Sequence, residues 1–203
     1  TFLLSIPASV AFVVASVPLI ATLFLYGRFS LIDLSMTQHA LLGYAVGLPA
    51  LIAVKVLAPA FYARQNIKTP VKIAITSLIA TQCFNAILIG FLQHAALSLS
   101  ISLAAILNAS VLFYFLIKHK IYKPQPGWLA FFVKLLLAVT LMAVAAWLIT
   151  QETSLWLQST AAARVTYFAG LALLCALIYF GSLWIMGVRL KDFVNIGKHP
   201  TQE

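Results

Sequence analysis

Residues 41–72 read LLGYAVGLPALIAVKVLAPAFYARQNIKTPVK, and this stretch decides the fold class. It begins with an apolar run long enough to cross a bilayer as a helix, carries one lysine inside that run and ends in a basic turn. The pair Thr69 and Pro70 follows the turn and is typical of a helix start. The rest of the chain repeats this plan of a long apolar run closed by a short polar loop. The sequence therefore predicts an all-α membrane protein.

The composition supports the bilayer as the solvent of this chain. Of its 203 residues, 63% are hydrophobic and only 8% are charged, whereas soluble domains carry about 25% charged residues. The apolar runs do not alternate with polar residues, which disfavours a β-barrel. The net charge of +9 is explained by basic loops between membrane spans, so no nucleic-acid partner is expected.

Six transmembrane helices are predicted, and the loops between them alternate in charge. The second and fourth loops and the tail are basic, which predicts that both ends of this segment are cytoplasmic. The predicted spans are about Phe2–Leu25, Met36–Tyr62, Pro70–Leu92, Ala96–Ile117, Trp128–Thr150 and Ala161–Met186.

Lys55 is the sharpest candidate for function, because a charged side chain inside a membrane span is costly. Two interpretations remain open: the long stem reaches the interface, or the ammonium faces an aqueous cavity and meets an anionic headgroup or a coupling ion. Arg64, Lys68 and Lys72 follow in the basic turn. We predict that these four cations lie near anionic headgroups.

Four prolines inside predicted spans are candidates for helix kinks. A proline lacks the N–H that would bond to the carbonyl four residues earlier, and its ring crowds that carbonyl. Pro59 in this way frees the carbonyl of Lys55. The candidates are Pro7, Pro18, Pro49 and Pro59.

The sequence offers no catalytic constellation. The four acidic residues lie in loops or the tail, and neither Cys83 nor Cys175 has a metal-binding partner at a typical spacing. We therefore expect no enzyme activity, no metal site and no cofactor, with ion coupling left open.

The last two predicted spans are apolar on every face, which is typical of helices exposed to lipid. The sequence thus divides into residues 1–117 with four helices, a basic cytoplasmic linker 118–127, a peripheral transmembrane hairpin 128–187 and a cytoplasmic tail 188–203.

Several strings along the chain resemble the MurJ (MviN) family of bacterial lipid II flippases, within the multidrug/oligosaccharidyl-lipid/polysaccharide exporter superfamily. The resemblance covers nearly the whole chain up to Trp128, and its most specific string lies at 54–74. The strings are SIPASVA at 5–11, LFLYGRF at 23–29, MTQHAL at 36–41, VKVLAPAFYARQNIKTPVKIA at 54–74, LSLSISLAAILNAS at 97–110 and KIYKPQPGW at 120–128.

The resemblance implies that this chain is the C-terminal part of a fourteen-helix bundle. Its first four helices would complete the second transporter lobe, and the last two would border the groove for an undecaprenyl tail. The family's essential arginines and acid lie in earlier helices, so their roles transfer to no residue of this chain.

The implied function is translocation of lipid-linked peptidoglycan precursor, lipid II, from the cytoplasmic to the periplasmic leaflet of the bacterial inner membrane. The implied partners are the bilayer, the undecaprenyl-linked precursor and the N-terminal half of the same protein. Two alternatives stay open: an exporter of another lipid-linked oligosaccharide or drug, and a membrane scaffold that transports nothing.

Overall fold

The computed structural model describes residues 1–120, 127–152, 156–157 and 159–187. The predicted tail 188–203 and most of the predicted linker 118–127 lie outside these residues. The described part holds helices and no strand, and the seven helices are α1 (Phe2–Val14), α2 (Ser16–Phe24), α3 (Leu31–Tyr62), α4 (Lys68–Leu92), α5 (His94–Lys118), α6 (Trp128–Thr150) and α8 (Ala161–Ile185).

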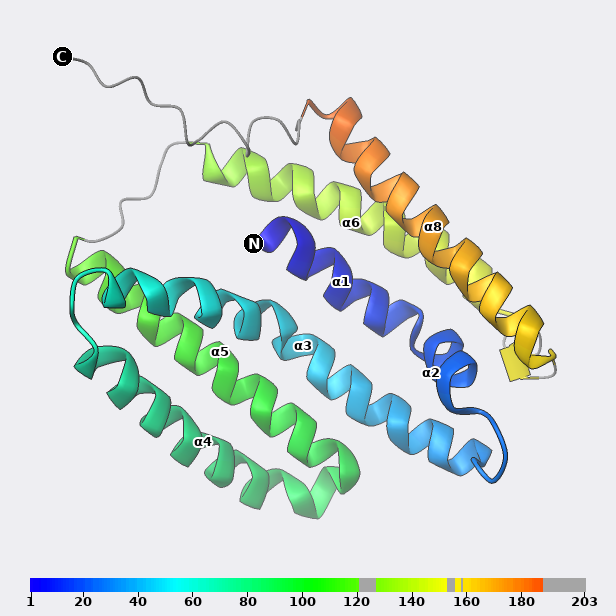
Figure 1. The fold of residues 1–203 in the computed structure, drawn as a ribbon, viewed down its shortest axis with the longest axis horizontal. Helices are drawn as coiled ribbons and strands as arrows, with labels where there is room; N and C mark the ends of the chain where they lie inside the picture. The colour runs from blue at the N-terminus through cyan, green and yellow to red at the C-terminus, as the bar shows by residue number, and fades with distance from the viewer. Residues whose placement is uncertain (121–126, 153–155, 158, 188–203) are drawn as a thin grey trace.

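The helices pack side by side in a row (Figure 1). α4 packs on α5, α5 on α3, and α3 on α1 and α2; beyond α1 lie α6 and α8, which pack on each other. The hairpin of α6 and α8 meets the other helices mainly through α1 and α2. α1 and α2 therefore connect the two parts of the bundle.

The membrane helical bundle is confirmed. Five of the described helices are long and apolar enough to cross a bilayer, and their bounds nearly match the last five predicted spans. The first predicted span differs, because it is broken into α1 and α2, which meet at Ala15 with a bend of 75°.

Pro18 gives this break a physical cause. It is the third residue of α2, where its missing N–H leaves the carbonyl of Val14, the last residue of α1, without a helical partner. Proline is tolerated in the first turn of a helix, where N–H groups have no partner within the helix. The break before Pro18 thus converts a mid-span proline into a first-turn proline.

Replacing Pro18 with alanine should straighten the first span. With a bend of 75°, the backbones at Leu4 and Leu23 are roughly 23 Å apart, against roughly 29 Å for a straight helix with 1.5 Å rise per residue. Spin labels at these two exposed positions would show the distance lengthen in Pro18→Ala. Pro7→Ala is the matched control, since α1 is continuous through Pro7; equal distances in all three proteins would contradict this role of Pro18.

Two other prolines free carbonyls that neighbouring helices use. Pro7 leaves the Leu3 carbonyl without a helical donor, and the Tyr179 hydroxyl of α8 donates to it. Pro49 frees the Ala45 carbonyl in the same way, and the Ser9 hydroxyl of α1 donates to that oxygen.

α3 runs as one helix through Pro49 and Pro59, and its ribbon changes direction part-way along its length (Figure 1). The assignment of individual kinks to Pro7, Pro49 and Pro59 stays a prediction. The contacts at Pro7 and Pro49 give proline a second role, because each proline frees a backbone carbonyl that accepts a hydrogen bond from another helix.

Small residues bring α3 and α5 into close contact. Gly43 and Gly47 lie one turn apart and face Ser98 and Ser102 of α5. The Ser102 hydroxyl donates to the Gly43 carbonyl at 2.6 Å. Close approach through small residues with hydrogen bonds between helices is the usual means of packing in lipid.

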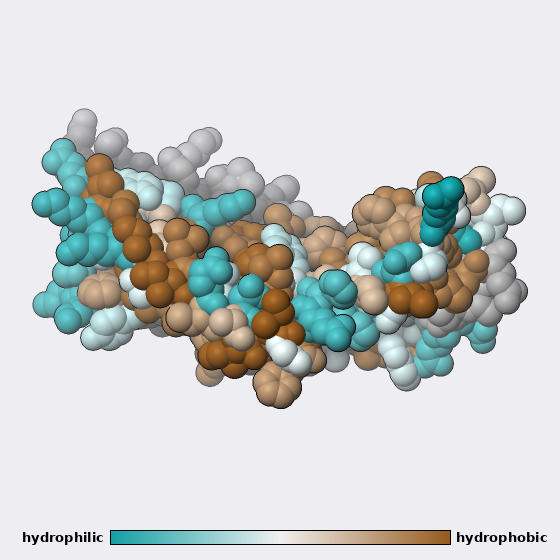
Figure 2. Space-filling view, turned by 90° about the horizontal axis from the view of Figure 1, so that it is seen from below, coloured by the Kyte–Doolittle hydropathy of each residue, from teal (hydrophilic) through white to brown (hydrophobic). Residues whose placement is uncertain are grey.

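The surface left after packing is largely apolar. In Figure 2 hydrophobic residues form several large groups on the face shown, with smaller hydrophilic groups between them, and hydrophilic residues gather most densely at the left-hand end, where α3 and α5 finish and α4 begins. Large apolar side chains of α6 and α8 remain exposed, Leu129 by 81% and Ile185 by 86%. Such a surface is expected of helices that face lipid.

Candidate functional site

Three of the four predicted headgroup residues lie together at one end of the bundle, which we call the basic end. Arg64 lies in the turn after α3, and Lys68 and Lys72 lie in the first two turns of α4. A buried cluster joins this turn to the end of α5; its members are Phe61, Ile73, Leu112 and Leu116.

α5 adds further cations to the basic end. The sequence predicted these cations in the linker 118–127, outside any helix. Lys118 lies in the last turn of α5 and Lys120 follows it. The ammonium of Lys118 lies over the rings of Tyr114 and Phe115, at 5.8 and 6.0 Å from their centroids. These cation–π contacts hold the charge at the surface.

The described acidic residues lie away from the basic end. Asp33 is in the first turn of α3, where it forms a capping box with Ser30, and Glu152 follows α6 at the end remote from the linker. The basic end therefore carries a positive field that attracts anionic groups.

Lys55 lies about 10 Å of helix before the end of α3, at 1.5 Å per residue. Its side chain is exposed, as are those of Arg64, Lys68 and Lys72. Within the described residues Lys55 has no hydrogen bond or ion pair. The role of the four cations at a headgroup stays a prediction.

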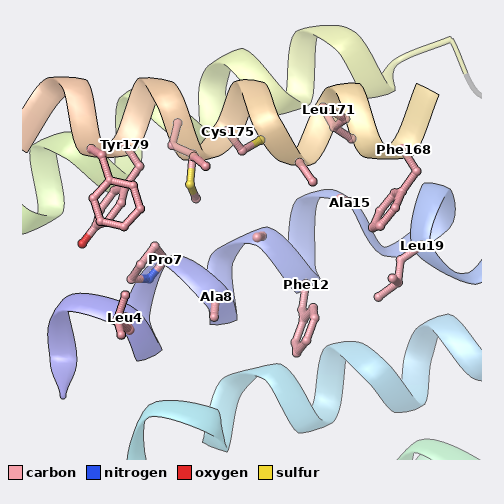
Figure 3. Close-up of a pocket in the computed structure, with 15 residues that line it drawn as sticks. Leu4, Pro7, Ala8, Phe12, Ala15, Leu19, Phe168, Leu171, Cys175 and Tyr179 are labelled. Atoms are coloured by element: carbon pink, nitrogen blue, oxygen red, sulfur yellow. The ribbon is translucent and has the colours of Figure 1, made fainter. Parts of the chain in front are cut away.

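An apolar groove lies between α1 and α8 (Figure 3), with a volume of about 260 Å³. The groove exists because small alanine side chains line both helices, with Ala8 and Ala11 on α1 and Ala172 and Ala176 on α8. Leu4, Phe12, Phe168 and Phe180 add large apolar surface. Tyr179 also lines the groove, but its hydroxyl donates a hydrogen bond to the Leu3 carbonyl. The lining suits an apolar chain.

Arg164 makes buried contacts that were not predicted from the sequence. The sequence places it just inside the sixth predicted span, and in the structure it lies in the first turn of α8 with only 8% of its surface exposed. One guanidinium nitrogen donates to the carbonyls of Leu25 at 3.0 Å and Ala21 at 3.4 Å, and the other donates to the carbonyl of Leu157 at 2.8 Å.

The C-terminal end of α2 explains why an arginine is placed there. The last carbonyls of a helix lack partners within the helix and carry partial negative charge. Arg164 supplies both hydrogen-bond donors and a positive charge to this end. A signal was present in the sequence: the cation stands among alanines, with no acidic residue beside it.

The described residues contain no group of three His, Cys, Asp or Glu side chains that could hold a metal ion. The features that the structure does bring together are the basic end, the apolar groove and the Arg164 contacts. The basic end and the apolar groove suit the charged and apolar parts of an amphipathic molecule.

Comparison with known proteins places this arrangement in a family. The profile of the family described as "Lipid II flippase MurJ" matches residues 1–168. The chain is 43% identical over 194 residues to the lipid II flippase MurJ of Burkholderia cenocepacia, covering 95% of this chain and 38% of that protein.

Two further relatives are more distant. The chain is 35% identical over 188 residues to the probable lipid II flippase MurJ of Haemophilus influenzae, covering 93% of this chain and 37% of that protein. It is 32% identical over 189 residues to that of Vibrio cholerae, covering 93% and 36%. The chain thus spans less than two-fifths of the length of these relatives. Because the family profile covers most of the chain, including the break at Ala15, the basic end and Arg164, this chain belongs to the MurJ family of lipid II flippases.

Proposed function

We propose that this chain forms the C-terminal portion of a flippase that moves lipid II across the bacterial inner membrane, from the cytoplasmic to the periplasmic leaflet. The observation that carries the proposal is the family match over residues 1–168. The homologues are named as flippases, which are transporters rather than enzymes.

The chemistry of the proposed substrate fits two features of this chain, the basic end and the apolar groove. A lipid-linked sugar precursor combines an anionic diphosphate with a long isoprenoid tail. The basic end offers a positive field without a described acid beside it, which favours phosphate groups at the membrane surface. We infer that this end is cytoplasmic, in agreement with the positive-inside rule.

The apolar groove fits a segment of the isoprenoid tail. Its volume of about 260 Å³ is small beside ligand pockets, which hold roughly 300–1,000 Å³. The groove therefore accommodates part of a long chain, with the remainder of the tail in the bilayer.

The remaining helices of the full-length protein are the expected partner of α4. Among the described helices α4 packs extensively only on α5, and it leaves Gln82 exposed in the middle of its span. An amide group facing lipid lacks hydrogen-bond partners. We infer that another part of the same protein covers this face, because alternating access in such transporters needs two lobes that move against each other.

Depletion of the native flippase tests the proposed function in a bacterium that depends on it. The full-length gene containing this chain is expected to restore growth, and the same gene without residues 1–203 is expected to fail. Growth without these residues, at equal expression of both proteins, would overturn the proposal.

Lys55→Ala in the full-length protein should lower lipid II transport. One surface cation attracts an anionic headgroup with about 1 kcal/mol, so we expect roughly a fivefold loss. Lys55→Arg is the matched control because it keeps the charge. The role of Lys55 is excluded if the alanine variant transports lipid II at the normal rate.

A further inference from the structure

α8 is attached to the first span by two polar contacts near its opposite ends. Arg164, in its first turn, binds the end of α2 through the carbonyls of Ala21 and Leu25. Tyr179 binds the start of α1 through the carbonyl of Leu3. The two residues are separated by roughly 22 Å of helix, at 1.5 Å per residue.

Each contact uses a carbonyl that the sequence has left without a helical donor. The Leu25 carbonyl is free because α2 ends there, and that of Leu3 because Pro7 has no N–H. The Ala21 carbonyl also accepts the Leu25 N–H, so Arg164 is its second donor. Arg164 and Tyr179 are both buried, with 8% and 2% of their surface exposed. The hydrogen bonds are therefore shielded from water, and their donors have few alternative partners.

The apolar groove lies between α1 and α8 (Figure 3), and its α8 lining begins at Phe168, one turn after Arg164, and includes Tyr179. Across it, apolar side chains such as Ala11 of α1 and Cys175 of α8 line the groove, and both pack against the apolar cluster that α6 shares with α8. Lipid tails can replace such contacts at little cost, because no hydrophobic force drives helices together within a bilayer. α6 packs on both helices through apolar side chains, so the polar contacts at the two ends are the directional contacts that join α8 to the first span itself.

We propose that Arg164 and Tyr179 set the width of the apolar groove by holding α8 against the two halves of the broken first span. Both are positioning residues, since they bind backbone carbonyls and not an occupant of the groove. The proposal concerns the opening of the groove and holds for any apolar chain that enters it.

Crosslinking across the groove tests the proposal in the full-length protein in membranes. Ala11→Cys pairs with the native Cys175, both of which line the groove, while Cys83 and all other cysteines become serine. A protease site inserted within residues 121–126 reports the crosslink, because the two fragments then stay together after cleavage. The rate is measured with a short bifunctional thiol reagent.

Arg164→Gln and Tyr179→Phe are each expected to slow the crosslinking roughly threefold to tenfold, the range that interhelical hydrogen bonds give. Pro7→Ala should match Tyr179→Phe, because it restores the helical donor to the Leu3 carbonyl, and combining these two should add little. Tyr167→Phe on α8 is the control, since Tyr167 is 53% exposed and its ring contact with Trp156 survives.

Unchanged rates in Tyr179→Phe and Pro7→Ala would overturn the proposal. If Arg164→Gln does not fold, Tyr179→Phe and Pro7→Ala decide the test, because each of these two substitutions removes only a few atoms. Equal slowing by the Tyr167→Phe control would also overturn it, since the effect would then not depend on the two contacts.

Discussion

Gly47→Ala is expected to destabilise the protein by about 2–3 kcal/mol, the range found for overpacked cores. A Cβ added at Gly47 would lie 2.4 Å from the Cα of Ser102 and 2.5 Å from its Cβ and Oγ. The nearest atom belongs to the backbone of α5, so no side-chain rotation relieves the clash. α3 and α5 must move apart, and this movement weakens the hydrogen bond that the Ser102 hydroxyl donates to the Gly43 carbonyl.

Thermal unfolding of the purified full-length protein in detergent measures this effect. Gly90→Ala and Gly170→Ala are matched controls, since a Cβ at either position meets no atom within 4 Å. Alanine favours a helix over glycine by about 1 kcal/mol, so the controls should be neutral or stabilising. Ser102→Gly should rescue Gly47→Ala only in part, because the Cα of residue 102 remains. A Gly47→Ala protein as stable as Gly90→Ala would contradict the close packing of α3 on α5.

Arg164→Ala is expected to cost about 2–4 kcal/mol, because the carbonyls of Leu25 and Leu157 would lose their donor and that of Ala21 would keep only the Leu25 N–H. Arg164→Lys should recover only part of the loss, since one ammonium cannot reproduce the planar fork of the guanidinium. The same unfolding measurement checks both variants.

Arg64→Ala provides the comparison for Arg164, because Arg64 is exposed in the turn after α3. Substitutions at such surface sites usually change stability by less than about 0.5 kcal/mol. If Arg64→Ala and Arg164→Ala lower the unfolding temperature equally, Arg164 does not hold α2 in the way described.

The helices were predictable because apolar runs of bilayer length have few alternatives. α6 spans Trp128–Thr150, as predicted, and α8 ends at Ile185, one residue before the predicted end. The family resemblance was confirmed by the match over residues 1–168. Both results depend on features that are local in the sequence, namely run length and characteristic strings.

The tertiary roles of single residues were less predictable. Pro7 and Pro18 both predicted a kink in the apolar run from Phe2 to Leu25, but the sequence did not show which of them would give the 75° break at Ala15. The contacts of Arg164 were not predictable, because its partners, the carbonyls of Ala21 and Leu25, lie some 140 positions earlier in the chain. Such partners follow from packing and not from local sequence.

The predicted headgroup residues also show that position in the sequence is easier to predict than tertiary contacts. Basic turns are recognisable from sequence, so Arg64, Lys68 and Lys72 could be placed at one end of the bundle. The alternation of loop charge also predicted that the basic linker 118–127 lies on the same side of the membrane as this turn. The packing of α5 against α3 and α4, which sets where Lys118 lies within that end, was not predictable from the loop sequences. Which of these cations meets a substrate headgroup stays a prediction.

If this chain is a necessary part of a lipid II flippase, lipid II reaches the outer leaflet only when residues 1–203 are present in the full-length protein. In cells depleted of their native flippase, an externally added enzyme that cleaves lipid II reports the pool that has crossed the membrane. The full-length protein is expected to restore cleavage, whereas the protein lacking residues 1–203 and this chain alone are each expected to leave lipid II protected. Normal cleavage without these residues, or continued protection with the full-length protein stably inserted, would contradict the account.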